Sequence, residues 1–270
     1  MSLTVRKPDV RPPTAAPRAW LNGNVTVSRF FDAAGIVIGP MERFGVRVIR
    51  RLRGRVPAMD ATLRGFCGQE SQHSRIHRRF DAALAAQGLR FEPCVARQER
   101  LLRWVERRCR PRLQLSIVVA LEHNFASLGD LVLRDRVMDG AEPEHRDLWE
   151  WHGVEELEHK AVAFRLYQAL GAPWWHRQLG LVLASLLMWL PLIHTALVLL
   201  RQDPGFSAAR RRQDRAAWLA AGHATLWQLA ARYARPYLSP SYDPDQIDHS
   251  ALIAETLARL EPRLAAAGGG

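Results

Sequence analysis

The chain has 270 residues, long enough for one sizeable core, and a formal net charge of +11 that comes almost wholly from arginine, since Lys7 and Lys160 are the only lysines. Its basic segments are not interleaved with aromatic residues. This argues against a nucleic-acid partner and leaves solvated helix faces or an anionic membrane surface as their role. Cys67, Cys94 and Cys109 are odd in number, lack a C-x-x-C spacing and follow no signal-peptide pattern, so we expect reduced cytosolic thiols.

Strand signals are scarce beyond residue 27, while Ala, Leu and Arg dominate, and this composition predicts an all-α fold. Residues 1–25 are rich in proline and should form an irregular arm that packs late or stays mobile. Helical periodicity then predicts five helices, with Pro40 as a kink or break in the first. These helices cover residues 27–53, 58–87, 95–108, 112–138 and 144–170.

Residues 179–200 contain no formally charged side chain, and their length meets the requirement of roughly 20 residues for crossing a bilayer. Two alternatives stay open: a helix that packs in the bundle or on a membrane surface, and a true span. An amphipathic helix should follow as far as residue 235, then a proline-rich turn and a last helix near 248–261. We therefore expect a helical bundle over 26–170 with additional helices over 171–265, in the cytoplasm and either free or attached to the inner membrane.

The most specific pattern in the chain is His152-x-x-x-Glu156-x-x-His159. At ~100° per residue, Glu156 projects about 40° and His159 about 20° from His152, so three metal-binding side chains face one direction. Glu155 projects about 60° to the other side, where it would serve as a substitute ligand or as the hydrogen-bonding partner of a ligand. Glu158 points away and is expected to be solvated.

A second cluster is Glu70-x-x-His73, with His77 one turn further along the same face. His77 is expected to donate a hydrogen bond to a ligand or to be a bonded core histidine, and we predict it, with Glu155, as a residue that assists catalysis. Glu42 and Glu122 supply one further carboxylate from each of two other helices.

These residues occur in the order Glu, Glu-x-x-His, Glu, Glu-x-x-His, which is the inward-facing ligand set of ferritin-like di-iron and di-manganese bundles. The helix over 95–108 would be the long crossover between the two halves. The sequence therefore predicts a ferritin-like four-helix bundle that binds two metal ions. The predicted ligands are Glu42, Glu70, His73, Glu122, His152, Glu156 and His159. Carboxylate and imidazole without thiolate favour iron, with manganese or zinc as alternatives.

At these residues the chain resembles the bacterial family described as predicted metal-dependent hydrolases. The family's motifs are Gly-x-x-Glu-x-Phe, Gln-Glu-x-x-His-x-x-x-His, Ala-x-Glu-His and Trp-x-Trp-His-x-x-Glu-Glu-x-Glu-His-Lys-Ala-x-Ala-Phe. This chain matches them at residues 39–44, 69–77, 120–123 and 149–164. It departs from the family at Tyr242-Asp243-Pro244, where the family has Phe-His-Pro, and at Phe164-Arg165, where it has Phe-Asp.

The spacing around Glu156 is also similar to the last ligand helix of the di-iron p-aminobenzoate N-oxygenase group. That resemblance implies O2-dependent oxidation of a small organic substrate, with an electron donor as a further partner. The family name implies instead a hydrolase in which a metal-bridging hydroxide attacks an ester, amide or phosphate bond. A third hypothesis is a membrane-associated metal-binding protein, attached through residues 179–200. The sequence does not predict the oligomeric state.

Overall fold

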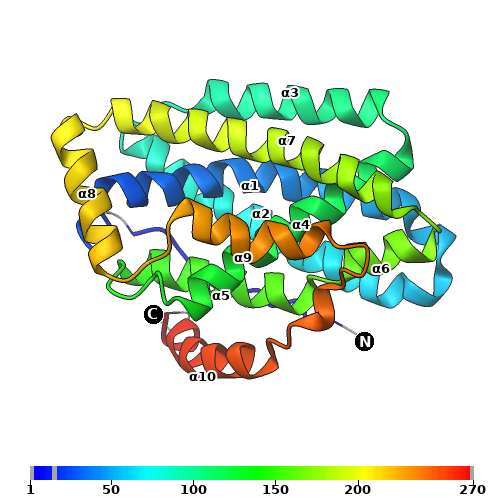
Figure 1. The fold of residues 1–270 in the computed structure, drawn as a ribbon. Helices are drawn as coiled ribbons and strands as arrows, with labels where there is room; N and C mark the ends of the chain where they lie inside the picture. Colours follow the sequence, from blue (N-terminus) through cyan, green and yellow to red (C-terminus); the bar gives the residue numbers. More distant parts are fainter. Residues whose placement is uncertain (1–2, 14–16, 268–270) are drawn as a thin grey trace.

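The computed structural model describes residues 3–13 and 17–267, and within them it is helical, with one isolated bridge between Leu21 and Ala141 (Figure 1). The predicted all-α bundle is confirmed. The helices are α1 (Val25–Leu52), α2 (Asp60–Ala86), α3 (Glu92–Arg108), α4 (Pro111–Arg134), α5 (Pro143–His159), α6 (Val162–Ala169), α7 (Trp174–Arg201), α8 (Ala208–Ala220), α9 (Leu226–Leu238) and α10 (Ser250–Ala267). Short 3-10 turns occur at 53–55, 57–59 and 244–246.

Local signals set where these helices begin. The Asn24 side chain accepts a hydrogen bond from the backbone of Val27 and so caps α1, while Pro111 and Pro143 stand at the first positions of α4 and α5, where a missing N–H costs nothing. Pro40 lies inside α1 without ending it. The long helices that carry the predicted ligands are therefore continuous through those residues.

The helices α1, α2, α4 and α5 enclose the main core. Helix α1 packs along α2 and contacts α4, and α4 packs against α5. Helix α3 runs along the outside of the bundle and joins α2 to α4, as expected of a crossover, and α7 lies across α1 and α4 (Figure 1). A side chain at Gly180 would overlap the backbone of Ser116, so this glycine lets α7 lie directly on α4.

Four predicted helices differ from the observed ones, and the last of them, expected near 248–261, extends to Ala267 as α10. The helix expected over 144–170 is two helices, because a turn at Lys160 and Ala161 separates α5 from α6. The helix expected up to residue 138 ends at Arg134, followed by Arg136 in the left-handed region at φ 48°. The helix expected as far as residue 235 is divided into α8 and α9 by a turn that contains Gly222 at φ 81°.

The N-terminal arm is packed where the structure describes it. A Cβ on Gly65 would lie 2.9 Å from the Leu3 side chain, and one on Gly68 would lie 2.6 Å from the Val5 side chain. Two glycines on α2 thus make room for the arm, whose residues Leu3 and Val5 lie directly against this helix. Residues 1–2, 14–16 and 268–270 lie outside the described residues.

Candidate metal centre

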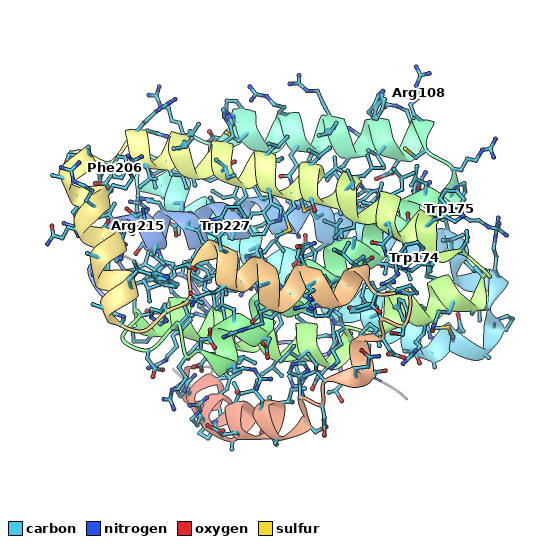
Figure 2. The ribbon with its side chains drawn as sticks, in the orientation of Figure 1. Arg108, Trp174, Trp175, Phe206, Arg215 and Trp227 are labelled. Atoms are coloured by element: carbon cyan, nitrogen blue, oxygen red, sulfur yellow. The ribbon has the colours of Figure 1, made fainter. Side chains whose placement is uncertain are left out.

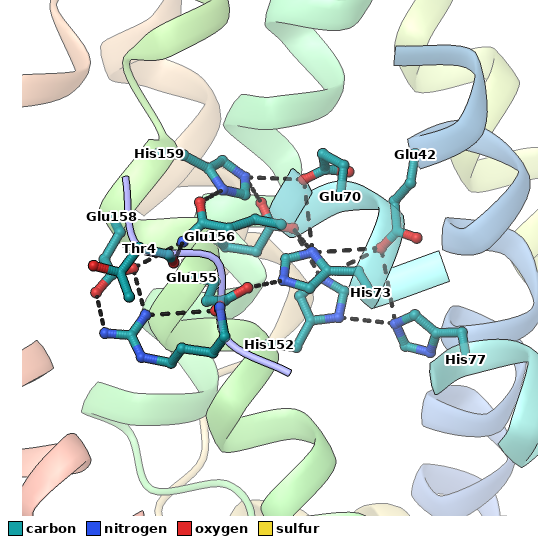
Figure 3. Close-up of polar contacts among 12 residues, drawn as sticks. Thr4, Glu42, Glu70, His73, His77, His152, Glu155, Glu156, Glu158 and His159 are labelled. Carbon is teal, nitrogen blue, oxygen red and sulfur yellow. Dashed lines mark hydrogen bonds and ion pairs between the residues drawn. The ribbon is translucent and has the colours of Figure 1, made fainter. Parts of the chain in front are cut away.

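The seven predicted ligands converge inside the bundle, and Figure 3 labels all of them except Glu122. Within the part of the chain that the structure describes, they form two clusters in which the ligand atoms all lie within 4.8 Å of one another. The candidate ligands of the first cluster are Glu42, His73, His152 and Glu156, and those of the second are Glu70, Glu122, Glu156 and His159. All seven side chains are buried, and Glu156 belongs to both clusters.

In the first cluster, Oε1 of Glu156 lies 2.8 Å from Nε2 of His152 and 3.4 Å from Nδ1 of His73. The nearer oxygen of Glu42, contributed by α1, lies 3.7 Å from Nε2 of His152 and 3.8 Å from Nδ1 of His73. One nitrogen of each imidazole and one oxygen of each carboxylate therefore surround a common point. Carboxylate oxygen and imidazole nitrogen are suitable ligands for a first-row divalent metal.

In the second cluster, Nε2 of His159 is the common contact. It lies 3.1 Å from Oε2 of Glu156, 3.1 Å from Oε1 of Glu70 and 3.3 Å from Oε2 of Glu122. The two oxygens of Glu156 are thus turned toward different clusters. A carboxylate in that position can bridge two cations, which is the role that carboxylates shared between facing helices have in binuclear bundles.

The two residues predicted to assist catalysis each contact a histidine on the side away from the clusters. Oε2 of Glu155 lies 3.1 Å from Nε2 of His73, and Nε2 of His77 lies 2.8 Å from Nδ1 of His152. The other ring nitrogen of each ligand candidate, Nδ1 of His73 and Nε2 of His152, faces the first cluster. A carboxylate that accepts the distal N–H of a ligand histidine fixes its tautomer and ring orientation, and Glu155 is placed to do so for His73.

Gln69 orients His159, the third histidine of the centre, and the sequence analysis did not predict this role. Its Oε1 lies 3.0 Å from Nδ1 of His159, so this nitrogen donates to the amide and Nε2 is left for the cluster. The side chain is fully buried. Its position directly before Glu70, inside a motif quoted for the family, was the available signal.

The N-terminal arm reaches the outside of this network (Figure 3). The Arg6 guanidinium donates to both oxygens of Glu158, at 2.7 and 2.8 Å, and Nε2 of Gln69 donates to the backbone oxygen of Thr4 and to Glu158. The expectation of a solvated Glu158 was therefore wrong, because its side chain is only 19% exposed and lies between the arm and α2. The positive charge of Arg6, in an N-terminal arm that has no helical periodicity, holds Glu158 in place.

Several buried ligand atoms have no hydrogen-bond partner among the described residues. They are both carboxylate oxygens of Glu42 and of Glu70, Oε2 of Glu122 and Nδ1 of His73. Some of them make short contacts with a neighbouring ligand, but outside hydrogen-bonding geometry. Buried polar atoms without partners are costly, and a bound cation satisfies carboxylate oxygens and an imidazole nitrogen together. The residues present therefore fit a metal at each cluster.

The charges in the centre are strongly coupled. Burial, together with the charge of Glu70, raises the pKa of Glu42 well above its usual value and that of Glu122 to about 8. Burial opposes charge on His159 as well, but the neighbouring carboxylates of Glu156, Glu122 and Glu70 together outweigh it and raise the pKa of this imidazole well above its usual value. Burial would likewise raise the pKa of Glu156, yet His159 and His152 hold it well below the usual value. Without metal, protons would balance much of the carboxylate charge.

A small cavity of about 10 Å³ adjoins the first cluster between α4 and α5, with room for roughly one water-sized molecule. Its wall is apolar apart from His152 and Glu156, which are two of the candidate ligands of the first cluster. A Cβ on Gly129 would lie 2.9 Å from the backbone oxygen of Gly153, so α4 and α5 approach closely beside the cavity. The apolar and glycine residues that line it are Ile38, Phe125, Leu128, Gly129, Val132, Trp149 and Gly153.

The two departures from the family pattern meet in space. Both guanidinium nitrogens of Arg165 donate to the carboxylate of Asp243, at 2.7 and 2.8 Å. Next to this pair, Tyr242 is 2.9 Å from Nδ1 of His123, whose Nε2 contacts the backbone oxygen of Tyr233 at 3.0 Å. His123 is thus a bonded core histidine, and burial lowers its pKa to about 4. The exchanged residues form an ion pair of their own outside the two clusters.

Comparison with protein families agrees with this centre. A sequence model of the family described as predicted metal-dependent hydrolase matches residues 4–248, a span that contains all seven candidate ligands as well as Arg6 and Gln69. Comparison with curated proteins and with solved structures gives no match. On the strength of the family match, which covers most of its length, this chain belongs to the predicted metal-dependent hydrolases.

Proposed function

We propose that the chain is an enzyme whose two clusters hold two divalent cations bridged by Glu156. The observation that carries this proposal is a balance of charge. Glu42, Glu70, Glu122 and Glu156 place four carboxylates in a space with almost no exposure, and two divalent cations would neutralise them. Uncompensated charge at such a depth is otherwise strongly unfavourable, so burial of this set argues for a function that needs the metal.

Iron and an O2-dependent oxidation of a small organic substrate fit the site best. The ligand types suit iron, their order along the chain is that of ferritin-like di-iron bundles, and the adjoining cavity suits a molecule of about the size of O2. Bound iron would supply the electrons for O2 reduction, and an external donor would restore them. The apolar wall of the cavity would keep bulk water away from the ligands.

The chain's own residues would keep the centre in one geometry. Glu155, His77 and Gln69 would fix the three imidazoles, so that each presents one defined nitrogen to the metal. The arm would hold Glu158 and Gln69 from outside through Arg6 and Thr4. Such support keeps ligand positions constant through a reaction cycle, which an oxidation that changes metal charge requires.

Hydrolysis of an ester, amide or phosphate bond is the second candidate, and the name of the family favours it. Two cations held on either side of Glu156 would then act as Lewis acids, one on the scissile bond and one on a water molecule. The enclosed centre is less favourable for this reaction, because a polar substrate would have to enter between packed helices.

Metal analysis of protein purified without oxygen separates these functions. We expect about two irons per chain and a new visible absorption on addition of O2, and loss of both in Glu156→Ala, since that residue serves both clusters. Glu150→Ala is the matched control, because Glu150 lies on the same helix but pairs with Arg263. Zinc or manganese without a response to O2 would favour the hydrolase. Protein that binds metal but catalyses no reaction would favour a role in metal storage. Folded protein that binds no metal would contradict the proposal.

A further inference from the structure

The outer face of α7 is a continuous apolar surface. Seven large side chains recur along it at intervals of three or four residues, and at ~100° per residue they project within an arc of about 80°. They are Trp175, Leu179, Val182, Leu186, Leu190, Ile193 and Leu197, here called the α7 stripe. Their exposure reaches 57% for Val182 and 61% for Leu190. An exposed row of this length on one helix marks an interaction site.

The inner face of the same helix is firmly attached to the bundle. Ala184 and Leu199 are fully buried, and Gly180 brings α7 against α4. By length and composition both α4 and α7 could cross a membrane, but the apolar window of α4 is 78% buried and that of α7 is only 33% buried. Helix α4 is therefore a core helix, while α7 has a partnered and an unpartnered side.

A basic face of α3 adjoins the stripe. Arg97, Leu101, Trp104 and Arg108 recur at helical spacing and are exposed. Nη1 of Arg97 lies 3.1 Å from Nε2 of His194 on α7, at the edge of the stripe. Figure 2 shows Arg108 projecting outward from the end of α3, with Trp174 and Trp175 at the neighbouring start of α7.

The acidic residues of α3 are turned away from this face. Glu99 and Glu106 pair with Arg43 and Arg47 of α1. Arg97 and Arg108, in contrast, have no carboxylate within 4.0 Å among the residues that the structure describes. The stripe itself carries no acid.

Arginine continues at the other end of the stripe. Gln202, just beyond α7, holds the backbone of Arg90 through two hydrogen bonds of 2.9 and 3.0 Å. Arg90 and the exposed Arg201 thus lie near the last turn of α7. The apolar row is therefore bordered, along one side and at its C-terminal end, by arginines that form no ion pair with a carboxylate of the described residues.

We propose that the α7 stripe and the basic face of α3 dock in plane on an anionic membrane surface. Apolar side chains would enter the boundary between headgroups and acyl chains, tryptophan would lie at headgroup depth, and the arginines would contact lipid phosphates. Crossing the bilayer is disfavoured, because α3, α1 and α4 pack beside α7 and would carry charged residues with it. A second copy is disfavoured because two such faces would bring arginines together without carboxylates to balance their charge. The docking does not depend on the proposed metal function.

Flotation with lipid vesicles tests this surface on the full-length, metal-loaded protein. We expect binding to vesicles that contain phosphatidylglycerol, weaker binding to pure phosphatidylcholine, and partial release by salt. The double variant Leu190→Glu with Ile193→Glu should bind at least about tenfold more weakly, since two side chains leave the apolar boundary. The double variant Arg97→Ala with Arg108→Ala should lose about fivefold per arginine, on the phosphatidylglycerol vesicles only.

Ile247→Glu is the matched control, because Ile247 is 54% exposed, close to the 53% of Ile193, and lies in the segment just before α10, a helix that Figure 1 shows across the bundle from α3 and α7. Its binding should equal that of the unchanged protein. Circular dichroism and metal content would show that each variant is folded. Absence of vesicle binding at low salt, or full binding by the Leu190 and Ile193 variant, would overturn the proposal. A dimer in solution that this variant dissociates, without vesicle binding, would assign the stripe to self-association instead.

Discussion

The backbone nitrogen of Arg6 lies 3.4 Å from Oε1 of Glu155, although the two residues are 149 positions apart in the chain. The other oxygen of the same carboxylate lies 3.1 Å from Nε2 of His73. A segment without regular structure is thereby connected to a candidate ligand through one intervening side chain. The arm is part of the support of the centre, and this relationship can be tested.

Replacing Arg6 by Ala should weaken metal binding without unfolding the bundle. Glu155 and Glu158 would lose the Arg6 guanidinium that pairs with both of them. The orientations of His73 and Gln69, which contact these two carboxylates, would then be less restricted. Partners outside the ligands themselves are commonly worth about 10–100-fold in affinity, and we expect the lower end because Arg6 is one step further away. Competition with a coloured chelator measures this. Arg11→Ala, which removes an exposed arginine of the same arm, should leave affinity unchanged, and equal affinity in both variants would mean that Arg6 only packs.

Replacing Gln69 by Leu should weaken the second cluster selectively. His159 would lose the acceptor for Nδ1, and its ring could turn or change tautomer, at a cost of about 10–100-fold in affinity for one of the two metals. Stepwise chelator titration resolves the two dissociation steps. Gln98→Leu is the comparison, because Gln98 is also buried but donates to the backbone of Val37. It should lower thermal stability and retain both metals. Two unchanged metal affinities in Gln69→Leu would remove Gln69 from the site.

Glu42 and Glu122 should differ from Glu156 in the number of metals that they control. Each belongs to one cluster, so Glu42→Ala and Glu122→Ala should each retain about one metal, whereas Glu156→Ala should retain almost none. Elemental analysis after extensive dialysis gives these ratios, with circular dichroism as the check on folding. Loss of both metals in every variant would mean that the two clusters do not bind independently.

Metal binding should stabilise the fold more at high pH than at low pH. Burial and the charge of Glu70 raise the pKa of Glu122 to about 8, so folding favours its protonated form. A carboxyl with a raised folded pKa stabilises the metal-free fold fully below the usual value, and this contribution is lost as pH rises through about 8. A cation prefers the ionised carboxylate, so the gain in melting temperature on metal binding should grow from about pH 6 to about pH 9. Melts of chelated and loaded protein measure it. Glu122→Gln should flatten the metal-free profile, and an unchanged profile would exclude this cause.

The grouping of the candidate ligands could be predicted because helical geometry translates spacing into direction. His152, Glu156 and His159 lie on one face at intervals of four and three, and no knowledge of the rest of the fold was needed to group them. Helix existence was similarly accessible, since proline and glycine mark most of the ends. The break at Lys160 and Ala161 was not, because neither residue interrupts a helix by its own chemistry.

Contacts between distant segments could not be read from periodicity. Residues 3–13 have no repeating pattern, and their place depends on Gly65 and Gly68, which look like ordinary weak points in a helix. The pattern of its own helix predicts that Glu158 faces solvent, but the residue that pairs with it, Arg6, comes from another segment of the chain. The ion pair of Arg165 with Asp243 was likewise hidden, since each residue alone is a departure from the family motif.

Glu156 has its Oε1 2.8 Å from His152 and its Oε2 3.1 Å from His159. The first cation to arrive would immobilise this carboxylate and leave its remaining oxygen aimed at the other cluster, so part of the ordering needed by the second cation would already be complete. The second cation should then bind somewhat more tightly than it would if Glu156 were still mobile, although each cluster keeps ligands of its own and can hold one ion alone. In a cell short of metal, such a centre would complete a half-filled chain more readily than it would begin to fill an empty one.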